Sequence, residues 1–426
     1  MRKISTLYIF NTNLEGCCDL GLGKKDGVGL WFDGKSDLLN GLENYLDPEE
    51  VFVEENISEN VIGTGIIDRK KVKIFTSANV GESTSYKPVC IYPANDTHVQ
   101  SIKNIVNNLP ESDWKVRVLK NKGEGACEAL EDEGIPYSFF TNSIQEKKEC
   151  GALLLLTDWG YSEIHILRKF QEAAVPVVCL QESIIDFGDD LRRMEWCNIP
   201  LIQGVVTVKS LMREIYFLTG NPRYEKLHVK DLPEKKLALI NVNFTYGIHE
   251  DIRQRWLSDV IEGCKRNGFE YWITQHPRDK SDLSGYPHAP SGSKEIHKAI
   301  EDSNILISRF SSLIHESIAL GRPVIYYNPH GEKMDYDFEP DGTILSEAKS
   351  AIALNQVLGR LGSGDQKINK DGIRRYVNKH MGSYDGCVTN RIIQGLRIAS
   401  ATPGGLVRRI NPIQKIKYNM HFLKNV

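Results

Sequence analysis

The chain has little net charge and no long hydrophobic run, and each absence excludes a class of protein. Its 53 basic and 56 acidic residues leave a formal net charge of -3, so the composition gives no electrostatic footprint for bulk nucleic-acid binding. No apolar run reaches the length of a membrane span, and the apolar stretch at residues 7–10 is too short for a signal peptide. We therefore expect a cytoplasmic protein.

The nine cysteines include no Cys-x-x-Cys pair, which argues against a disulfide framework and against a thiolate zinc site. Cys90 and Cys179 lie inside apolar runs, where a thiol acts as a small buried hydrophobe. The composition is otherwise that of an ordinary globular protein, with 41% hydrophobic and 26% charged residues. These features favour a reducing compartment.

A length of 426 residues exceeds what one hydrophobic core usually organises, so we expect two domains of roughly 200 residues each. From residue 88 onward, predicted strands alternate with predicted helices. This alternation is typical of a parallel, doubly wound α/β sheet. The strands are predicted at 89–92, 114–119, 152–157, 176–180 and 204–208, and the helices at 98–108, 125–133 and 162–174.

A second series of the same kind follows a stretch without periodicity. Its strands are predicted at 237–243, 269–274, 304–308 and 323–327, and its helices at 250–266 and 312–320. The predicted organisation is an unassigned segment (1–85) that belongs to the first domain, an acceptor domain (86–220), a linker (221–236), a donor domain (237–400) and a basic tail (401–426). Two such sheets in tandem would leave a cleft, and ligands of open α/β sheets bind at the carboxyl ends of the strands.

The strongest motif runs from residue 307 to 327, where a strand, a short helix and another strand follow one another. Ser311 and Ser312 stand at the expected start of the helix, where free backbone N–H groups and hydroxyls form an anion site suited to a diphosphate. Glu316 lies one turn further on and could accept hydrogen bonds from ribose hydroxyls. The alternative is a plain serine-capped helix, which leaves the polar His315–Glu316 pair unexplained.

This stretch resembles the bacterial CDP-glycerol glycerophosphotransferase family and the broader superfamily of capsule, sialyl- and Kdo-transferases with a His-Pro motif. Arg309 stands where the glycerophosphotransferases carry aspartate, so the donor group is left open. The resemblance implies the GT-B architecture, with two Rossmann-like doubly wound domains facing a cleft. It also implies a transferase that moves a sugar or polyol phosphate from a CMP- or CDP-linked donor to a cell-surface glycan or lipid-linked acceptor, in capsule or cell-wall polysaccharide synthesis.

The second match to that superfamily is Thr274-Gln-His-Pro-Arg278, at the end of a predicted strand. The resemblance implies that His276 contacts a donor phosphate or assists the leaving group, and Pro277 would fix the turn that aims the imidazole. No Asp-x-Asp triplet directly follows a predicted strand, so we expect no metal and no cofactor. In a metal-free mechanism His276, Arg278 and Arg309 would neutralise the phosphate charge.

Three further groups complete the predicted site. Thr245 and Gly247 could line the phosphate pocket, although an ordinary turn explains them equally well. Glu182 follows a buried strand, in the place where the glycerophosphotransferases carry histidine, and could be the base that activates the acceptor hydroxyl. Asp158 also follows a strand and is the rival for that role; either acid could instead cap the next helix.

The basic tail holds Arg408, Arg409, Lys415 and Lys417 among apolar residues. Such a segment could lie on the anionic inner face of a membrane, where lipid-linked acceptors reside. A solvated tail and a strap packed on the other domain are equally compatible with it. Two other functions stay open: a UDP-sugar 2-epimerase-like enzyme, which would want paired acids where this chain has His315 and Glu316, and a catalytically silent scaffold for polysaccharide assembly.

Overall fold

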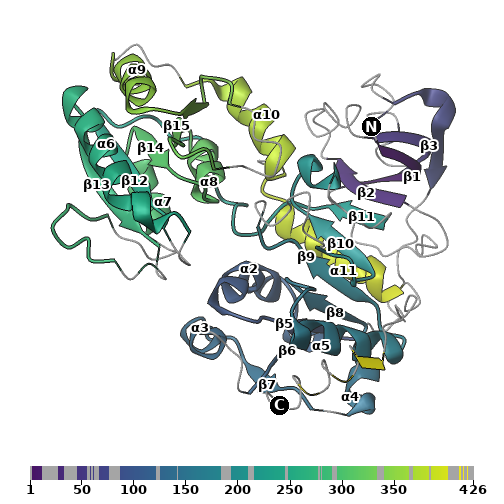
Figure 1. Cartoon of the computed structure of the whole chain (residues 1–426). Coiled ribbons are helices and arrows are strands. Elements are labelled where there is room, and N and C mark those ends of the chain that lie inside the picture. Colours follow the sequence, from purple (N-terminus) through teal and green to yellow (C-terminus); the bar gives the residue numbers. More distant parts are fainter. Residues whose placement is uncertain are drawn as a thin grey trace. The chain divides into compact units, whose positions relative to one another are not determined.

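A computed structural model describes most of the chain as two compact α/β units (Figure 1). The first unit comprises Met1–Glu225 with Asn378–Val426, and the second comprises Lys226–Val377. The described residues are 2–11, 27–32, 46–54, 58, 61, 67–75, 87–120, 125–141, 143–183, 193–209, 215–244, 248–276, 279, 281–289, 295–332, 340–363, 368–382, 385–401, 412–413, 416 and 420.

An 11-stranded sheet forms the centre of the first unit, and all of its strand pairs are parallel. The segment before residue 86 contributes four of these strands. Across the sheet the order is β4 (Val72–Phe75), β3 (Leu46–Glu54), β1 (Arg2–Asn11), β2 (Gly27–Phe32), β11 (Ile215–Leu218), β10 (Ile199–Ile202), β9 (Val177–Leu180), β8 (Ala152–Leu155), β5 (Val89–Tyr92), β6 (Trp114–Val118) and β7 (Tyr137–Phe139).

Helices cover both faces of this sheet, which explains why its strands read as unbroken apolar runs. Alternate side chains of β5 point to opposite faces: Val89 and Ile91 pack with α2 (Asp96–Asn107), α3 (Ala126–Asp132) and α11 (Val388–Ala401). Cys90 and Tyr92 pack instead with α5 (Tyr161–Glu172). The described residues of the unit also form α4 (Ile144–Lys148) and the 3-10 turns η4 (Arg69–Lys71), η5 (Glu111–Asp113) and η7 (Val205–Lys209).

The second unit has a five-stranded parallel sheet with the order β13 (Glu270–Gln275), β12 (Leu237–Val242), β14 (Ile305–Ser308), β15 (Val324–Tyr327) and β16 (Leu345–Ala348). One face packs on α6 (Arg253–Arg266) and α9 (Ala351–Gly362) through Trp256, Val260 and Leu358. The short helix α8 (Leu313–Ala319) contacts β14, β15 and α7 (Ile296–Glu301). The 3-10 turn η8 (Glu250–Ile252) precedes α6, and α10 (Lys370–His380) contains the boundary after Val377.

Two predictions about the first unit were wrong. Residues 205–209 form η7, not a strand, and the strand of this region is β10, with β11 following later. A short apolar run is ambiguous by itself, and at Gly204 a Cβ atom would come within 2.4 Å of the Lys379 carbonyl oxygen. This part of the chain is therefore shaped by a segment that lies about 175 positions away.

The second error concerns the donor domain, which was predicted to end at residue 400 but ends at Val377. Residues after 377 return to the first unit, because the apolar face of α11 joins its core: Ile392 and Leu396 pack with Leu201 and Phe217. At Gly395 a Cβ would lie 3.2 Å from the Leu201 side chain, so the helix approaches the sheet closely. The boundary near residue 225 falls within the predicted linker.

Candidate functional site

The carboxyl edge of the second sheet gathers polar side chains from three neighbouring strands. Asn243 follows β12, Arg309 follows β14, and the loop from Asn328 to Glu332 follows β15. Because the strands are parallel, these segments meet at one edge of the sheet, which is where open α/β folds bind ligands.

Arg309 holds this edge together and is only 4% exposed. Its Nη1 donates to the carbonyl oxygens of Asn243 (2.6 Å) and Ile248 (3.4 Å), while Nε donates to Glu332 Oε2 (3.0 Å) and Nη2 to Glu332 Oε1. Four of the five guanidinium N–H groups can thus be assigned to protein acceptors. The residue that we predicted to neutralise donor phosphate charge serves in this structure as a support for two loops.

The loop after β15 is closed by its own first residue. Asn328 Oδ1 accepts from the Glu332 N–H (2.7 Å) and Asn328 Nδ2 donates to the Glu332 carbonyl (2.8 Å). Gly331 between them has φ +73°, a conformation that favours glycine. Hydrogen bonds from the Asn328 side chain to the Glu332 backbone therefore fix the end of the loop.

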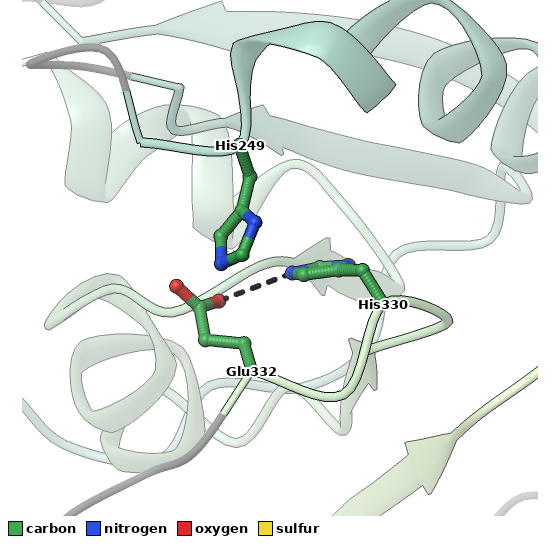
Figure 2. Close-up of side chains that lie close together, drawn as sticks. All are labelled: His249, His330 and Glu332. Carbon is green, nitrogen blue, oxygen red and sulfur yellow. Dashed lines mark ion pairs between the residues drawn. The ribbon is translucent and has the colours of Figure 1, made fainter.

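His249, His330 and Glu332 lie together at this edge (Figure 2), a cluster that our sequence analysis did not identify. One nitrogen from each ring and one carboxylate oxygen all lie within 4.8 Å of one another, and the ring centroids of the two histidines are 4.6 Å apart. Burial lowers the pKa of His330, against the opposing effect of the Glu332 carboxylate. The signal available in the sequence was a pair of histidines and a glutamate in the segments after two strands.

The two serines at the start of α8 differ in role. Ser311 is buried and its hydroxyl accepts from the Leu313 N–H (3.3 Å), whereas Ser312 is partly exposed and makes no side-chain cap bond. The Ser311 hydroxyl thus binds the first N–H of the helix, beside the N-cap residue Ser312. Both stand where the sequence placed them, directly after β14.

The polar pair of α8 is internal. Glu316 is 3% exposed and its Oε2 lies 2.6 Å from His297 Nε2 on α7. His315 is fully buried, with Nδ1 2.8 Å from the Tyr376 hydroxyl. The plain structural alternative therefore does explain this pair, since each side chain has a partner inside the second unit. The carboxylate that we predicted for ribose is engaged by His297.

The burial of His315 predicts a pH-dependent stability, because burial lowers its pKa from 6.5 to about 3. The unfolded chain takes up a proton near pH 6.5 and the folded chain does not, so this stability is present above pH 6.5 and is lost as the pH falls toward 3. Between pH 7 and pH 5 the loss should be about 2 kcal/mol. Urea unfolding at both pH values should show a smaller decrease for His315→Gln than for the wild type; equal decreases would contradict the prediction.

His276 directly follows β13, and Gln275, the last residue of that strand, bonds to residues that come shortly after it. Gln275 Nε2 donates to the carbonyl oxygens of Asp279 (3.1 Å) and Ser281 (2.8 Å). The buried Asp279 carboxylate pairs with Arg253 (3.1 Å), which also donates to the Phe244 carbonyl (2.7 Å). One guanidinium thus joins Asp279, three residues after His276, to Phe244, two residues after the end of β12. Pro277, Arg278, Thr245 and Gly247 lie outside the described residues, as do Arg408, Arg409, Lys415 and Lys417.

In the first unit, Glu182 has a partner that the sequence did not reveal. His98, near the start of α2, accepts the Ala94 N–H at Nδ1 (3.0 Å), and its Nε2 lies 3.1 Å from Glu182 Oε2. In a neutral imidazole with Nδ1 as acceptor, the proton is on Nε2, on the side of the carboxylate. The Glu182 backbone carbonyl accepts from Asn221 (3.1 Å), and its side chain stays 21% exposed.

Asp158, the rival of Glu182, is fully buried. Its Oδ1 accepts from the Met194 N–H (2.8 Å) and its Oδ2 from those of Trp196 (2.8 Å) and Cys197 (3.2 Å). Burial raises its pKa, against the effect of these hydrogen bonds. Both oxygens hold the segment that leads into β10, so of the two strand-end acids only Glu182 has an exposed carboxylate.

Comparison with solved structures finds similar folds at low sequence identity. A UDP-N-acetylglucosamine 2-epimerase described from Listeria monocytogenes has a TM-score of 0.50 at 14% identity, covering 73% of this chain and 95% of that one. The wall teichoic acid polymerase TagF has a TM-score of 0.49 at 13% identity, covering 73% and 88%; the glycotransferase of kitacinnamycin has 0.47 at 9%, covering 74% and 100%.

No family model matches the chain, and no curated protein matches it either. Its two parallel sheets and the fold that it shares with the Listeria protein define an α/β protein of the GT-B kind with two Rossmann-like units, as the sequence predicted. Among the helices of the described residues, none combines the length and apolar character of a membrane span.

Proposed function

We propose that this protein is a transferase that moves a sugar or polyol phosphate group from a nucleotide-activated donor to a glycan or lipid-linked acceptor. The observation that carries the proposal is the edge of the second sheet, where polar loops after β12, β14 and β15 converge and are fixed by Arg309 and Asn328. A preorganised polar edge at the carboxyl ends of parallel strands is the position where α/β folds hold nucleotides.

In the proposed mechanism the second unit holds the donor. Ser312 and the backbone N–H groups beside it bind the diphosphate, and His276 donates to a phosphate oxygen or to the departing nucleotide. Glu182 of the first unit takes the proton of the acceptor hydroxyl while the acceptor oxygen bonds to the transferred group. The bond from that group to the terminal phosphate oxygen of the nucleotide breaks, and the nucleotide leaves with the electron pair.

His98 has a positioning role in this scheme. Its Nε2 lies 3.1 Å from one Glu182 oxygen, and its ring is fixed by the Ala94 N–H. A buried ring at this distance restricts the orientation of the Glu182 carboxylate. Four points stay predictions: metal independence, the nature of the acceptor, a role in capsule or cell-wall synthesis, and contact with the inner face of a membrane.

A 2-epimerase-like enzyme is the second candidate, favoured by the similarity of the whole fold to the protein from Listeria. The two functions differ in their need for an acceptor. A 2-epimerase converts UDP-N-acetylglucosamine alone, so incubation of the chain with that compound, followed by proton NMR of the sugar, separates them. We expect no new sugar epimer without an acceptor.

The donor site is tested by a calorimetric and thermal-shift screen with CMP, CDP, UDP and GDP. We expect one nucleotide to stabilise the chain, by about 2.7 kcal/mol at a hundred times its Kd. Ser312→Ala and His276→Ala should each weaken binding about tenfold, the effect of losing one charge-assisted hydrogen bond. Matched controls are Ser363→Ala and His228→Ala, which are exposed positions of the second unit. Absence of binding by all four nucleotides would favour the silent scaffold.

A further inference from the structure

The side chain of His330 has unsatisfied polar atoms. It is 8% exposed, and neither ring nitrogen has a hydrogen-bond partner within the described part of the chain. Its Nε2 lies 3.5 Å from Glu332 Oε2, which is longer than an ordinary hydrogen bond. A buried polar atom without a partner costs about 1–3 kcal/mol, so a further ligand at this ring would remove a penalty that the fold otherwise carries.

The neighbours of His330 have the chemistry of metal ligands. Figure 2 shows the two imidazole rings and the Glu332 carboxylate converging from two loops. Their three candidate ligand atoms all lie within 4.8 Å of one another. His249 reaches the cluster from the segment before η8, and its φ of +57° is unusual for a side chain with a Cβ. Backbone strain of this kind is retained where the surrounding structure fixes it.

The supporting contacts orient two of the three ligands. Arg309 holds both Glu332 oxygens from one side, which leaves the outward lone pairs of the carboxylate for another partner. The same guanidinium donates to the carbonyl of Ile248 (3.4 Å), the residue before His249. Asn328 clamps the backbone of Glu332. Metal-binding carboxylates are typically held by such second contacts.

We propose that His249, His330 and Glu332 bind a divalent transition-metal ion of the Zn²⁺ class. Two imidazoles and one carboxylate are the donor set of such ions, and three protein ligands leave at least one position open for water or another oxygen. Mg²⁺ and Ca²⁺ fit poorly because they favour oxygen ligands.

An anion site at the same place is disfavoured. The Glu332 carboxylate would repel a phosphate, and the nearby cation, Arg309, already pairs with that carboxylate. The proposed ion would lie at the same sheet edge as the proposed donor site, but the inference does not depend on the transferase function. The proposed ion departs from our expectation that the protein binds no metal.

The test is a titration of the full chain, freed of metal by dialysis against a chelator, with Zn²⁺ by calorimetry and with Co²⁺ by visible absorption. We expect one saturable site and absorption bands of low-symmetry Co²⁺. His249→Gln and His330→Gln should each lower the affinity at least about a hundredfold, since even the loss of a hydrogen bond that supports a metal ligand costs 10–100-fold. The matched control is His288→Gln, an exposed histidine of the same unit, which should bind as the wild type does.

Two results would overturn the proposal: no saturable binding by the wild type, or binding that both variants keep unchanged. If a variant does not fold, X-ray absorption at the zinc edge of the loaded wild type decides the question. The proposal expects a shell of nitrogen and oxygen with the outer scattering of two imidazoles; a sulfur shell, or a shell without imidazole scattering, would assign the ion to another place.

Discussion

Glu182→Gln should lower the rate of donor turnover by 10² to 10⁴-fold while leaving nucleotide binding unchanged. This range is the usual contribution of a positioned general base. The amide has nearly the shape of the carboxylate but cannot take the proton of the acceptor hydroxyl. The backbone carbonyl of residue 182 still accepts from Asn221, so the loop should keep its conformation. The measurement is the rate at which nucleotide is released from a donor that carries the nucleotide identified by the screen.

The matched control for this variant is Glu172→Gln, a half-exposed acid at the end of α5 in the same unit, which should turn over at the wild-type rate. His98→Gln tests the positioning role: it should lower kcat and alter the pH profile, with KM for the donor unchanged. Unaltered turnover in Glu182→Gln, with nucleotide still bound, would remove Glu182 from the mechanism. Loss of donor binding in that variant would show that Glu182 acts elsewhere than at the acceptor.

Arg322→Ala should lower the free energy of unfolding of the second unit by about 3–5 kcal/mol, because several backbone carbonyls lose their donor at a cost of about 1–3 kcal/mol each. Arg322 is 1% exposed, and its guanidinium donates to five backbone carbonyls: Lys230 (2.8 Å), Asp231 (2.8 Å), Ile300 (3.2 Å), Glu301 (2.9 Å) and Leu320 (3.2 Å). Without it the carbonyls of Lys230, Asp231 and Glu301 lose this donor, whereas those of Ile300 and Leu320 still accept from the Ser303 and Lys230 N–H groups. Burial lowers the pKa of the guanidinium, but nearby acidic groups favour its charge.

Urea unfolding followed by hydrogen exchange distinguishes this unit from the other. Peptides from residues 226–377 should lose protection at lower urea in Arg322→Ala, whereas peptides from 87–183 should not. Arg322→Lys should recover only part of the loss, because an ammonium group offers three donors from one point. The exposed Arg266→Ala, which removes a surface pair with Glu262, should change stability by less than about 0.5 kcal/mol. An equally small effect at Arg322 would contradict the account.

The fold was predictable where the signal is local. Strands buried on both faces are continuous apolar runs, so β5, β12, β14 and β15 were found within one or two residues of their ends. The return of the chain to the first unit was not predictable, because α11 has the pattern of any amphipathic helix and its partners lie about 190 residues earlier. The four N-terminal strands were not assigned, because that segment is rich in glycine and charge and its apolar pieces are short.

The sequence predicted which segments after strands carry the candidate site, but not the contacts that their side chains make. Ser311, His276 and Glu182 do follow strands, as expected from their sequence context. The sequence does not reveal that Glu182, and not Asp158, keeps an exposed carboxylate. The backbone amides that bind Asp158 lie about 36 residues further along the chain. The contact of His98 with Glu182 joins residues 84 positions apart, and the cluster of His249, His330 and Glu332 depends on sheet order in the same way.

Hydrogen exchange of the full chain, with and without the nucleotide that gives the largest thermal shift, tests the central claim most directly. The account predicts slower exchange at the carboxyl edge of the second sheet, in peptides covering 308–316 and 328–332, with His276→Ala weakening the effect. Slower exchange confined to the first unit, or no slowing within residues 226–377 at saturating nucleotide, would contradict the assignment of the donor site.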